Sequence, residues 1–218
     1  MKLLLKKKNP YLFKAKNILK AQEFIEEIAI AFVSSAEETM FGNWLEGLAV
    51  FVSEKVYGAY KSSAKGIDIE FNKEGIHYIV SIKSGPNWGN SPQIKKMIED
   101  FNSAKKTLLT SNSKMNIRAV NGCCYGKDSV PYKKGDYIKL CGQEFWKFLT
   151  NIDTFYLDII EPIGVEAKQK NDAYKREYAK MVNKLTKEFI EEFCDVEGSI
   201  NWSKIITYNS SSNKTQIE

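Results

Sequence analysis

Arginine and histidine are the scarcest chemically active residues in this sequence. Only Arg118 and Arg176 carry a guanidinium group, and His77 is the single histidine. Because His77 falls in a predicted strand, histidine-metal nucleases, phospholipase-type nucleases and serine–histidine–aspartate hydrolases would lack their base. Lysine supplies nearly all the positive charge, so a polyanionic partner would be bound by point charges more than by bidentate arginine forks.

Cysteine patterns for zinc and long apolar runs are also missing. The cysteines are Cys123, Cys124, Cys141 and Cys194. Without a CxxC pair they are expected to be free thiols in a reducing cytosol. The absence of a GxxxxGK[ST] loop argues against an ATP-driven translocase. The apolar run within residues 1–8 is too short for a signal peptide or a membrane span, so we expect a soluble, cytoplasmic protein.

The remaining composition is that of a mildly basic globular protein. The chain has 218 residues, of which 43% are hydrophobic, and its formal charge is +5. This length supports one sizeable core, and the positive balance suits a nucleic acid as partner. We expect a single domain over residues 1–209 and a flexible tail at 210–218.

Hydrophobic periodicity predicts an α/β (α+β) fold, with a mixed central sheet and flanking helices. N-terminal helices are expected within residues 18–57. The first would end near Val33, and Ser35 would cap the second. Residues 66–71 and 76–83 predict the two strands of an antiparallel hairpin.

The segments after this hairpin alternate between helix and strand. Ser91 as N-cap and Pro92 at the first helical position predict a helix with one apolar and one lysine-rich face. Further strands are predicted at 117–125, 137–140 and 154–160, a short helix at 144–149, and a long helix at 166–193 that is ended by Gly198. The apolar stripe of the long helix is typical of core or dimer packing.

The predicted hairpin carries the most distinctive side chains. Alternation places Asp68 and Glu70 on one face of the first strand, and Ser81 and Lys83 share a face of the second. Glu70 is expected opposite His77. The other face of the first strand would be apolar, with Ile67, Ile69 and Phe71.

The pairing of the two strands decides whether their polar residues meet. A four-residue turn would set Phe71 opposite Ile76. Asp68 would then oppose Ile79, and Lys83 would lie roughly 13 Å further along, too far for joint catalysis. A shift by an even number of residues brings Asp68 and Lys83 together and keeps the faces unchanged.

A carboxylate and a lysine at a strand edge suit phosphodiester hydrolysis. Mg²⁺ takes oxygen ligands, neutralises a phosphate and lowers the pKa of a bound water. Asp68 and the Ile82 carbonyl would bind such an ion, and Lys83 would orient or deprotonate the water and stabilise developing charge. The alternative interpretation is an exposed hairpin with a solvated charged face, because short patterns of this kind also arise by chance.

Asp68 followed by Ser81-Ile82-Lys83 resembles the PD-(D/E)xK nuclease signature. The stretch from Lys83 to Asn90 is similar to one in type II restriction endonucleases of that superfamily. Other similar segments lie at 9–13, 34–42, 125–126 and 142–146, so the resemblance covers most of residues 9–202.

This resemblance implies a restriction-endonuclease-like core and Mg²⁺-dependent cleavage of double-stranded DNA at a short palindrome. It also implies a homodimer and a DNA methyltransferase as genetic partner. Some relatives cut interrupted GG/CC palindromes.

Two positions depart from the signature. Gly66-Ile67 precedes Asp68 where a proline is usual, and Ser81 replaces the second acidic residue. A neutral hydroxyl is a poor Mg²⁺ ligand. The resemblance favours Glu46 as the replacement, because the family often draws a glutamate from the helix before the hairpin. Glu70 is the second choice.

Candidate DNA contacts follow the catalytic strand. Asn87 and Asn90 would contact bases or phosphates, and Trp88 would pack against sugar. The alternative is a tight turn that leads into the next helix, with Trp88 as its hydrophobic anchor. Additional candidates are Lys95, Lys96 and Arg118. The lysines also fit an ordinary solvated helix face.

The sequence is also compatible with two alternative functions. One is a DNA repair or junction-cleaving nuclease of the same fold. The other is a catalytically inactive DNA-binding module, which Ser81 in place of an acidic residue would favour.

Overall fold

The computed structural model describes residues 5–6, 8–128, 130, 137–164 and 167–212. Contacts divide the chain into two compact units, one formed by residues 1–38 with 165–218 and the other by residues 39–164. Each unit has its own buried hydrophobic residues. The single domain over 1–209 stays a prediction.

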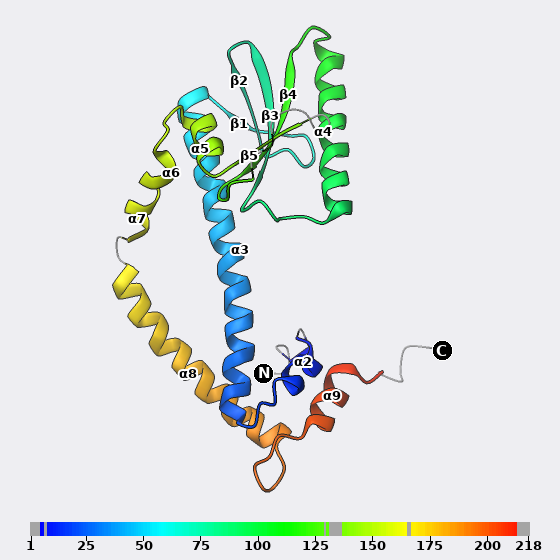
Figure 1. Cartoon of the computed structure of the whole chain (residues 1–218), viewed down its shortest axis with the longest axis vertical. Coiled ribbons are helices and arrows are strands. Elements are labelled where there is room, and N and C mark those ends of the chain that lie inside the picture. The colour runs from blue at the N-terminus through cyan, green and yellow to red at the C-terminus, as the bar shows by residue number, and fades with distance from the viewer. Residues whose placement is uncertain (1–4, 7, 129, 131–136, 165–166, 213–218) are drawn as a thin grey trace. The chain divides into compact units, whose positions relative to one another are not determined.

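The unit of residues 39–164 contains a five-stranded sheet in the order β1-β2-β3-β4-β5 (Figure 1). The strands are β1 (Tyr60–Lys61), β2 (Ile69–Lys73), β3 (Ile76–Lys83), β4 (Ile117–Cys123) and β5 (Tyr137–Cys141). The first three strands pair antiparallel, whereas β3, β4 and β5 run parallel. The register aligns Lys83, Cys123 and Cys141, so three carboxyl ends share one edge of the sheet.

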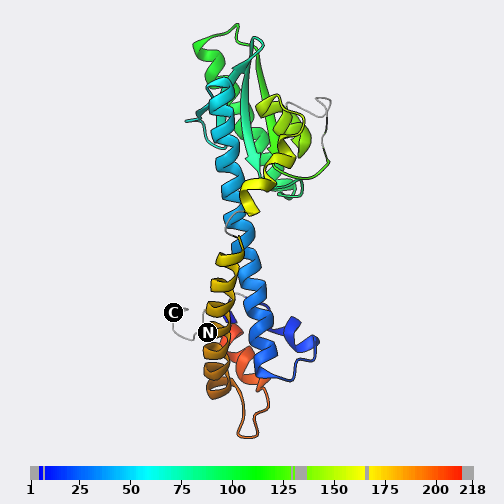
Figure 2. The same ribbon diagram turned by 90° about the vertical axis from the view of Figure 1, so that its left-hand side faces the viewer.

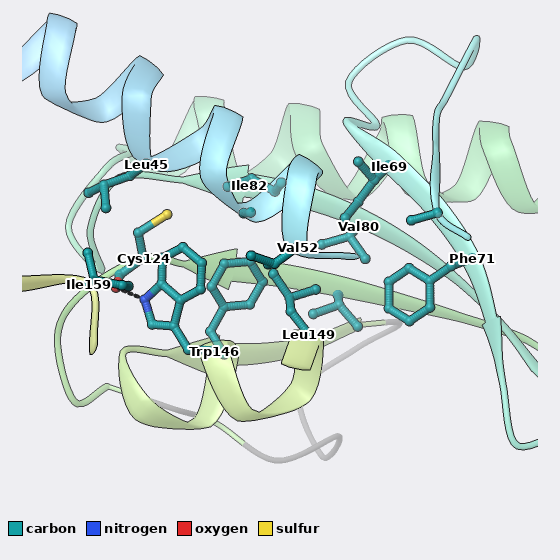
Figure 3. Packing of buried hydrophobic residues seen from close by; sticks show 14 residues of the cluster. Leu45, Val52, Ile69, Phe71, Val80, Ile82, Cys124, Trp146, Leu149 and Ile159 are labelled. Atoms are coloured by element: carbon teal, nitrogen blue, oxygen red, sulfur yellow. Dashed lines mark hydrogen bonds between the residues drawn. The ribbon is translucent and has the colours of Figure 1, made fainter. Parts of the chain in front are cut away.

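Helices cover both faces of this sheet. The second half of α3 (Ala21–Tyr57) and α5 (Gln143–Thr150) pack on one face, where Figure 3 shows Leu45, Ile82 and Trp146 in a common core. The Trp146 indole N–H donates to the Cys124 carbonyl at 2.8 Å. The other face is covered by α4 (Ser91–Ser111), and two short helices, α6 (Phe155–Asp158) and α7 (Ile160–Gly164), follow α5. The predicted mixed sheet with flanking helices is confirmed.

The other unit is helical. It contains α2 (Pro10–Ala15), the first half of α3, α8 (Ala167–Phe193) and α9 (Trp202–Ser210). Figures 1 and 2 show the C-terminal end of α8 meeting this part of α3, and Phe24, Ile28 and Phe189 are buried in their common core. In the described part of the chain, no helix is both long and apolar enough to cross a membrane.

Two predictions of secondary structure are wrong, namely the helix break near Val33 and the strand at 154–160. α3 is continuous through the predicted break, and Ser35 lies inside it, where its Oγ donates to the Ala31 carbonyl at 3.0 Å instead of capping a new helix. The strand predicted at 154–160 is instead α6 and the start of α7. Phe155 and Ile159 lie four residues apart and both pack against the core, which is a helical spacing.

The limits of two later helices also differ. Asn90, not Ser91, is the N-cap of α4, since its side chain accepts from the Gln93 N–H in a capping box. α8 ends at Phe193, ahead of Gly198, and Glu166 lies outside the described residues. The predicted tail at 210–218 begins at the last residue of α9, and its residues 213–218 lie outside the described part.

Candidate active site

The hairpin of β2 and β3 pairs two residues away from the predicted register. Lys73 lies opposite Ile76, and Phe71 lies opposite Tyr78. The turn contains only Glu74 and Gly75, which have φ angles of 51° and 75°, as a two-residue hairpin turn requires. This even shift brings Asp68 to the end of β3.

Asp68, Ile82 and Lys83 meet at that strand end. Asp68 Oδ2 accepts the Ile82 N–H at 2.5 Å, and the Asp68 N–H donates to the Val80 carbonyl at 2.8 Å. Lys83 Nζ donates to the Ile82 carbonyl at 3.0 Å. Because the N–H and C=O of one strand residue point toward the same neighbour, the Ile82 carbonyl is also directed toward the Asp68 side. The predicted grouping of these three residues is present.

Asp68 lies where the chain changes faces of the sheet. Ile67 is buried in the cluster of Met97 and Phe101 on α4, whereas Ile69 is buried in the cluster on the opposite face. The prediction that Ile67 and Ile69 share a face is therefore wrong, because regular pairing in β2 begins only at Ile69. Gly66, with φ of 75°, precedes this change of face.

Glu46 on α3 is electrostatically coupled to the same site. Its neighbour Leu45 is buried in the core with Ile82 and Cys124. Burial and the negative charge of Asp68 raise the pKa of Glu46, and the positive charges of Lys83 and Lys61 partly oppose this rise. Burial and the Glu46 charge raise the pKa of Cys124 to about 12.

Glu70, the second candidate carboxylate, already accepts three side-chain hydrogen bonds. It accepts from Ser62 Oγ at 2.5 Å, from Tyr60 OH at 3.2 Å and from His77 Nε2 at 2.9 Å. Although burial raises its pKa, these hydrogen bonds lower it more. In the ladder Glu70 lies opposite Ile79 instead of His77, and the His77 ring reaches it diagonally.

Ser81 is 1% exposed and lies opposite Asn121 on β4, which is 2% exposed. A side chain so enclosed is poorly placed to meet a hydrated cation. Within the described residues, no group of three or more histidine, cysteine, aspartate or glutamate side chains is arranged to hold a metal ion. The candidate ligands are therefore two carboxylates, Asp68 and Glu46, and the Ile82 carbonyl.

These groups fit a magnesium ion. Mg²⁺ keeps several waters and commonly takes one or two carboxylates together with substrate phosphate. Burial, and after it the negative charge of Asp68, raise the pKa of Glu46, while Lys83 and Lys61 partly offset the rise. A bound cation would relieve the repulsion between the two carboxylates. The Ile82 carbonyl retains a second lone pair beside the one that Lys83 uses.

The predicted DNA-contact residues differ in how close they lie to Lys83 at the end of β3. Asn87 is exposed, and Trp88 lies beneath Lys83 Nζ at 5.2 Å from the ring centroid. Asn90 caps α4 through its side-chain oxygen. Arg118 is exposed beside Tyr78, five register positions before the partner of Lys83, or roughly 17 Å away at the usual strand rise.

The first turns of α4 supply the two predicted lysines. Lys95 is exposed. Lys96 pairs with Asp100 at 2.9 Å and lies 3.9 Å from Glu99. Hydrogen bonding to Asp100 raises the pKa of Lys96. Lys96 thus carries a partly compensated charge, and Lys95 is the better candidate for a phosphate contact.

Three loops approach one another closely at the carboxyl edge, which the sequence did not predict. A Cβ on Gly85 would lie 2.2 Å from the Tyr125 ring, and one on Gly142 would lie 2.4 Å from the Gly126 carbonyl oxygen. Lys139 Nζ donates to the Pro86 carbonyl at 3.2 Å. The glycines near each strand end were the sequence feature that could have predicted these close approaches.

Lys61 was also missed, because the two residues of β1 are too short a strand to predict. Lys61 lies opposite Ile69 in the sheet, and its charge lowers the pKa of Glu46. It therefore adds a positive charge to the surroundings of the two candidate carboxylates.

A mixed five-stranded sheet with helices on both faces, and a carboxylate and a lysine meeting at a strand end, define a restriction-endonuclease-like α/β fold. The family model described as Type II restriction endonuclease EcoO109I matches residues 1–171, and the chain belongs to this family. It is thus an endonuclease of a restriction system, a hydrolase whose substrate is DNA. The predicted relation to type II restriction endonucleases is confirmed. A search of curated proteins gave no match.

Proposed function

We propose that this chain is a type II site-specific deoxyribonuclease that hydrolyses DNA with Mg²⁺ at a short palindromic duplex site. The observation that carries the proposal is the meeting of Asp68, Ile82 and Lys83 at the end of β3. The PD-(D/E)xK signature supplies the same residue types. Membership of the EcoO109I family supports the reaction class.

Asp68, Glu46 and the Ile82 carbonyl would hold the cation. Bound there, Mg²⁺ would supply the Lewis acidity that neutralises the scissile phosphate and activates a water. Burial and the negative charge of Asp68 raise the pKa of Glu46, which supports this assignment, since a divalent ion stabilises ionised carboxylates that are partly buried together. Glu70 is not proposed as a ligand, because three donors already occupy its carboxylate.

Lys83 would act at the reacting phosphate. Its ammonium lies at the Ile82 carbonyl, beside the proposed cation ligands. From this position it would orient the attacking water and stabilise the negative charge that develops on the phosphate oxygens. Ser81 would contribute no direct ligand, because it is enclosed within the sheet.

The DNA backbone would approach the loop between β3 and α4. Asn87 is exposed there, and the Asn90 amide nitrogen is separate from the oxygen that caps α4. Lys95 and Lys96 would add positive charge beside a phosphate. Arg118 lies too far along the sheet to join this group.

The proposed enzyme is a homodimer, because a palindrome is most simply bound by a protein with two-fold symmetry. Sedimentation in the presence and absence of DNA tests this, and a monomer in both conditions would contradict it. A methyltransferase encoded beside this gene would protect host DNA and is the expected genetic partner.

Digestion of a sequenced plasmid by purified protein, followed by sequencing of the fragment ends, tests the proposed activity. The proposal predicts discrete fragments, one palindromic sequence at every end, and no cleavage when EDTA removes Mg²⁺. Cleavage only at branched or damaged DNA would favour a repair or junction nuclease of the same fold. Sequence-specific binding without cleavage would favour an inactive DNA-binding module.

A further inference from the structure

The ammonium group of Lys83 lies over the indole ring of Trp88. Lys83 Nζ is 5.2 Å from the ring centroid and donates to the Ile82 carbonyl at 3.0 Å. An ammonium within about 6 Å of an aromatic centroid is attracted by the negative face of the ring, most strongly for tryptophan. The ring and the carbonyl therefore hold one ammonium between them.

Trp88 is itself fixed from two directions. Its side chain packs against the buried cluster that contains Ile67, Met97 and Phe101. Two residues later, the capping box of Asn90 and Gln93 anchors the chain at the start of α4. The ring is thus attached to the same core that holds Ile67, the neighbour of Asp68.

We propose that Trp88 is a positioning residue whose ring holds the Lys83 ammonium beside Asp68 and the Ile82 carbonyl. The inference rests on the proposed role of Lys83 in cleavage. An unrestrained lysine samples many positions through its four-carbon stem, so a fixed ring limits where the charge resides before DNA arrives. The ring face that takes the ammonium is not available to a deoxyribose, which sets this role apart from a DNA contact.

Single-turnover cleavage of a plasmid that the wild type cuts provides the first test. Trp88→Leu keeps an apolar side chain but removes the aromatic face, and its cleavage rate should fall roughly two- to thirtyfold. Trp88→Phe keeps a weaker face and should recover part of that loss. DNA affinity, measured with EDTA present, should remain that of the wild type for both variants.

Lys14 and Trp202 provide a matched control pair. Lys14 Nζ lies 5.3 Å from the Trp202 ring centroid, and both residues belong to the other compact unit. Lys14→Met removes a cation–π contact of similar geometry and should leave the single-turnover rate unchanged.

A double-mutant cycle without DNA tests the contact independently of catalysis. The urea midpoints of Lys83→Met, Trp88→Leu and the double variant should be non-additive, because either single change already removes the interaction. Additive midpoints would overturn the inference. This measurement is unaffected if Lys83 proves dispensable for cleavage.

The cleavage results separate the inference from the function on which it rests. If Lys83→Met is inactive while Trp88→Leu cuts at the wild-type rate, the positioning role is wrong and the proposed site stands. Weakened DNA binding by Trp88→Leu with an unchanged rate would make Trp88 a DNA contact and also overturn the inference. If Lys83→Met cuts normally, the proposed site fails, while a non-additive cycle still confirms the contact.

Discussion

Asp68 Oδ2 accepts a hydrogen bond from the backbone N–H of Ile82 at 2.5 Å. This contact joins the residue before β2 to the second-last residue of β3, fourteen positions further along the chain. It fixes a carboxylate next to a carbonyl and a lysine ammonium. The carboxylate consequently has two separate roles, one in the hairpin structure and one proposed at the cation.

Two substitutions of Asp68 distinguish those roles. Asp68→Asn retains an oxygen that accepts the Ile82 N–H but removes the charge, so we expect normal stability and no cleavage. Asp68→Ala removes the acceptor as well and should lower the free energy of unfolding by about 1 kcal/mol relative to Asp68→Asn. Urea unfolding measures the difference, and equal stabilities would contradict the structural role.

Glu46→Gln should reduce cleavage far more than Ser81→Ala. Loss of a proposed ligand charge should lower the single-turnover rate by roughly a hundredfold or more, with partial recovery at higher Mg²⁺ or with Mn²⁺. Ser81 is enclosed, so removing its hydroxyl should change the rate by less than about threefold. Rates measured across a metal titration test the ranking. The reverse order would remove Glu46 from the site.

The pH dependence of stability should report the carboxylate pair. Glu46 has a pKa above its ordinary value of 4.5 through burial and the charge of Asp68. The folded protein therefore binds the Glu46 proton more tightly than the unfolded chain does. The stability gained from this proton is complete below pH 4.5 and is lost as the pH rises through the raised pKa. In EDTA, Glu46→Gln should gain stability over the wild type as the pH rises.

Thermal unfolding with and without a divalent cation measures this effect. The cation should remove the advantage of Glu46→Gln, since it stabilises the ionised wild-type pair. Glu54→Gln on the same helix is the control, because Glu54 is exposed. An identical pH profile for the wild type and Glu46→Gln would contradict the predicted repulsion.

Glu70 should show the opposite pH dependence. Hydrogen bonds from Ser62, His77 and Tyr60 lower its pKa despite burial. Its contribution to stability is present above pH 4.5 and is lost as the pH falls through the lowered folded pKa. Glu70→Gln should reduce the free energy of unfolding at neutral pH by about 1–3 kcal/mol, with a smaller difference in acid. Glu74→Gln in the exposed turn should have little effect at either pH.

The sequence predicted the sheet and its flanking helices and placed the candidate residues Asp68, Ile82 and Lys83 on one hairpin, but it did not predict the register of that hairpin. The register depends on the turn, which consists of Glu74 and Gly75. Glutamate is uncommon at positive φ, so the sequence did not indicate a two-residue turn at this position. Asn72 and Lys73 therefore looked like turn residues while they belong to β2. The error was an even number of residues, so it separated Asp68 from Lys83 in the prediction without changing the strand assignments.

Other differences also came from contacts between distant segments. Ser35 looked like a cap, but its hydroxyl bonds back into α3. The apolar run at 154–160 was compatible with a strand, and packing of Phe155 and Ile159 against the core selected helices. Short apolar runs carry too little periodicity to make that choice. The coupling of Glu46 to Asp68 was expected only through the family resemblance.

The cation-binding role of Asp68 and the phosphate role of Lys83 are tested most directly by single-turnover cleavage of a sequenced plasmid in Mg²⁺. Asp68→Asn and Lys83→Met are compared with the exposed control substitutions Asp158→Asn and Lys114→Met. We expect the first two variants to bind the plasmid as the wild type does but to leave it uncut, while both controls cut it at the wild-type rate. Near-normal cleavage by Asp68→Asn would contradict the proposed cation ligand, and near-normal cleavage by Lys83→Met would contradict the proposed phosphate role.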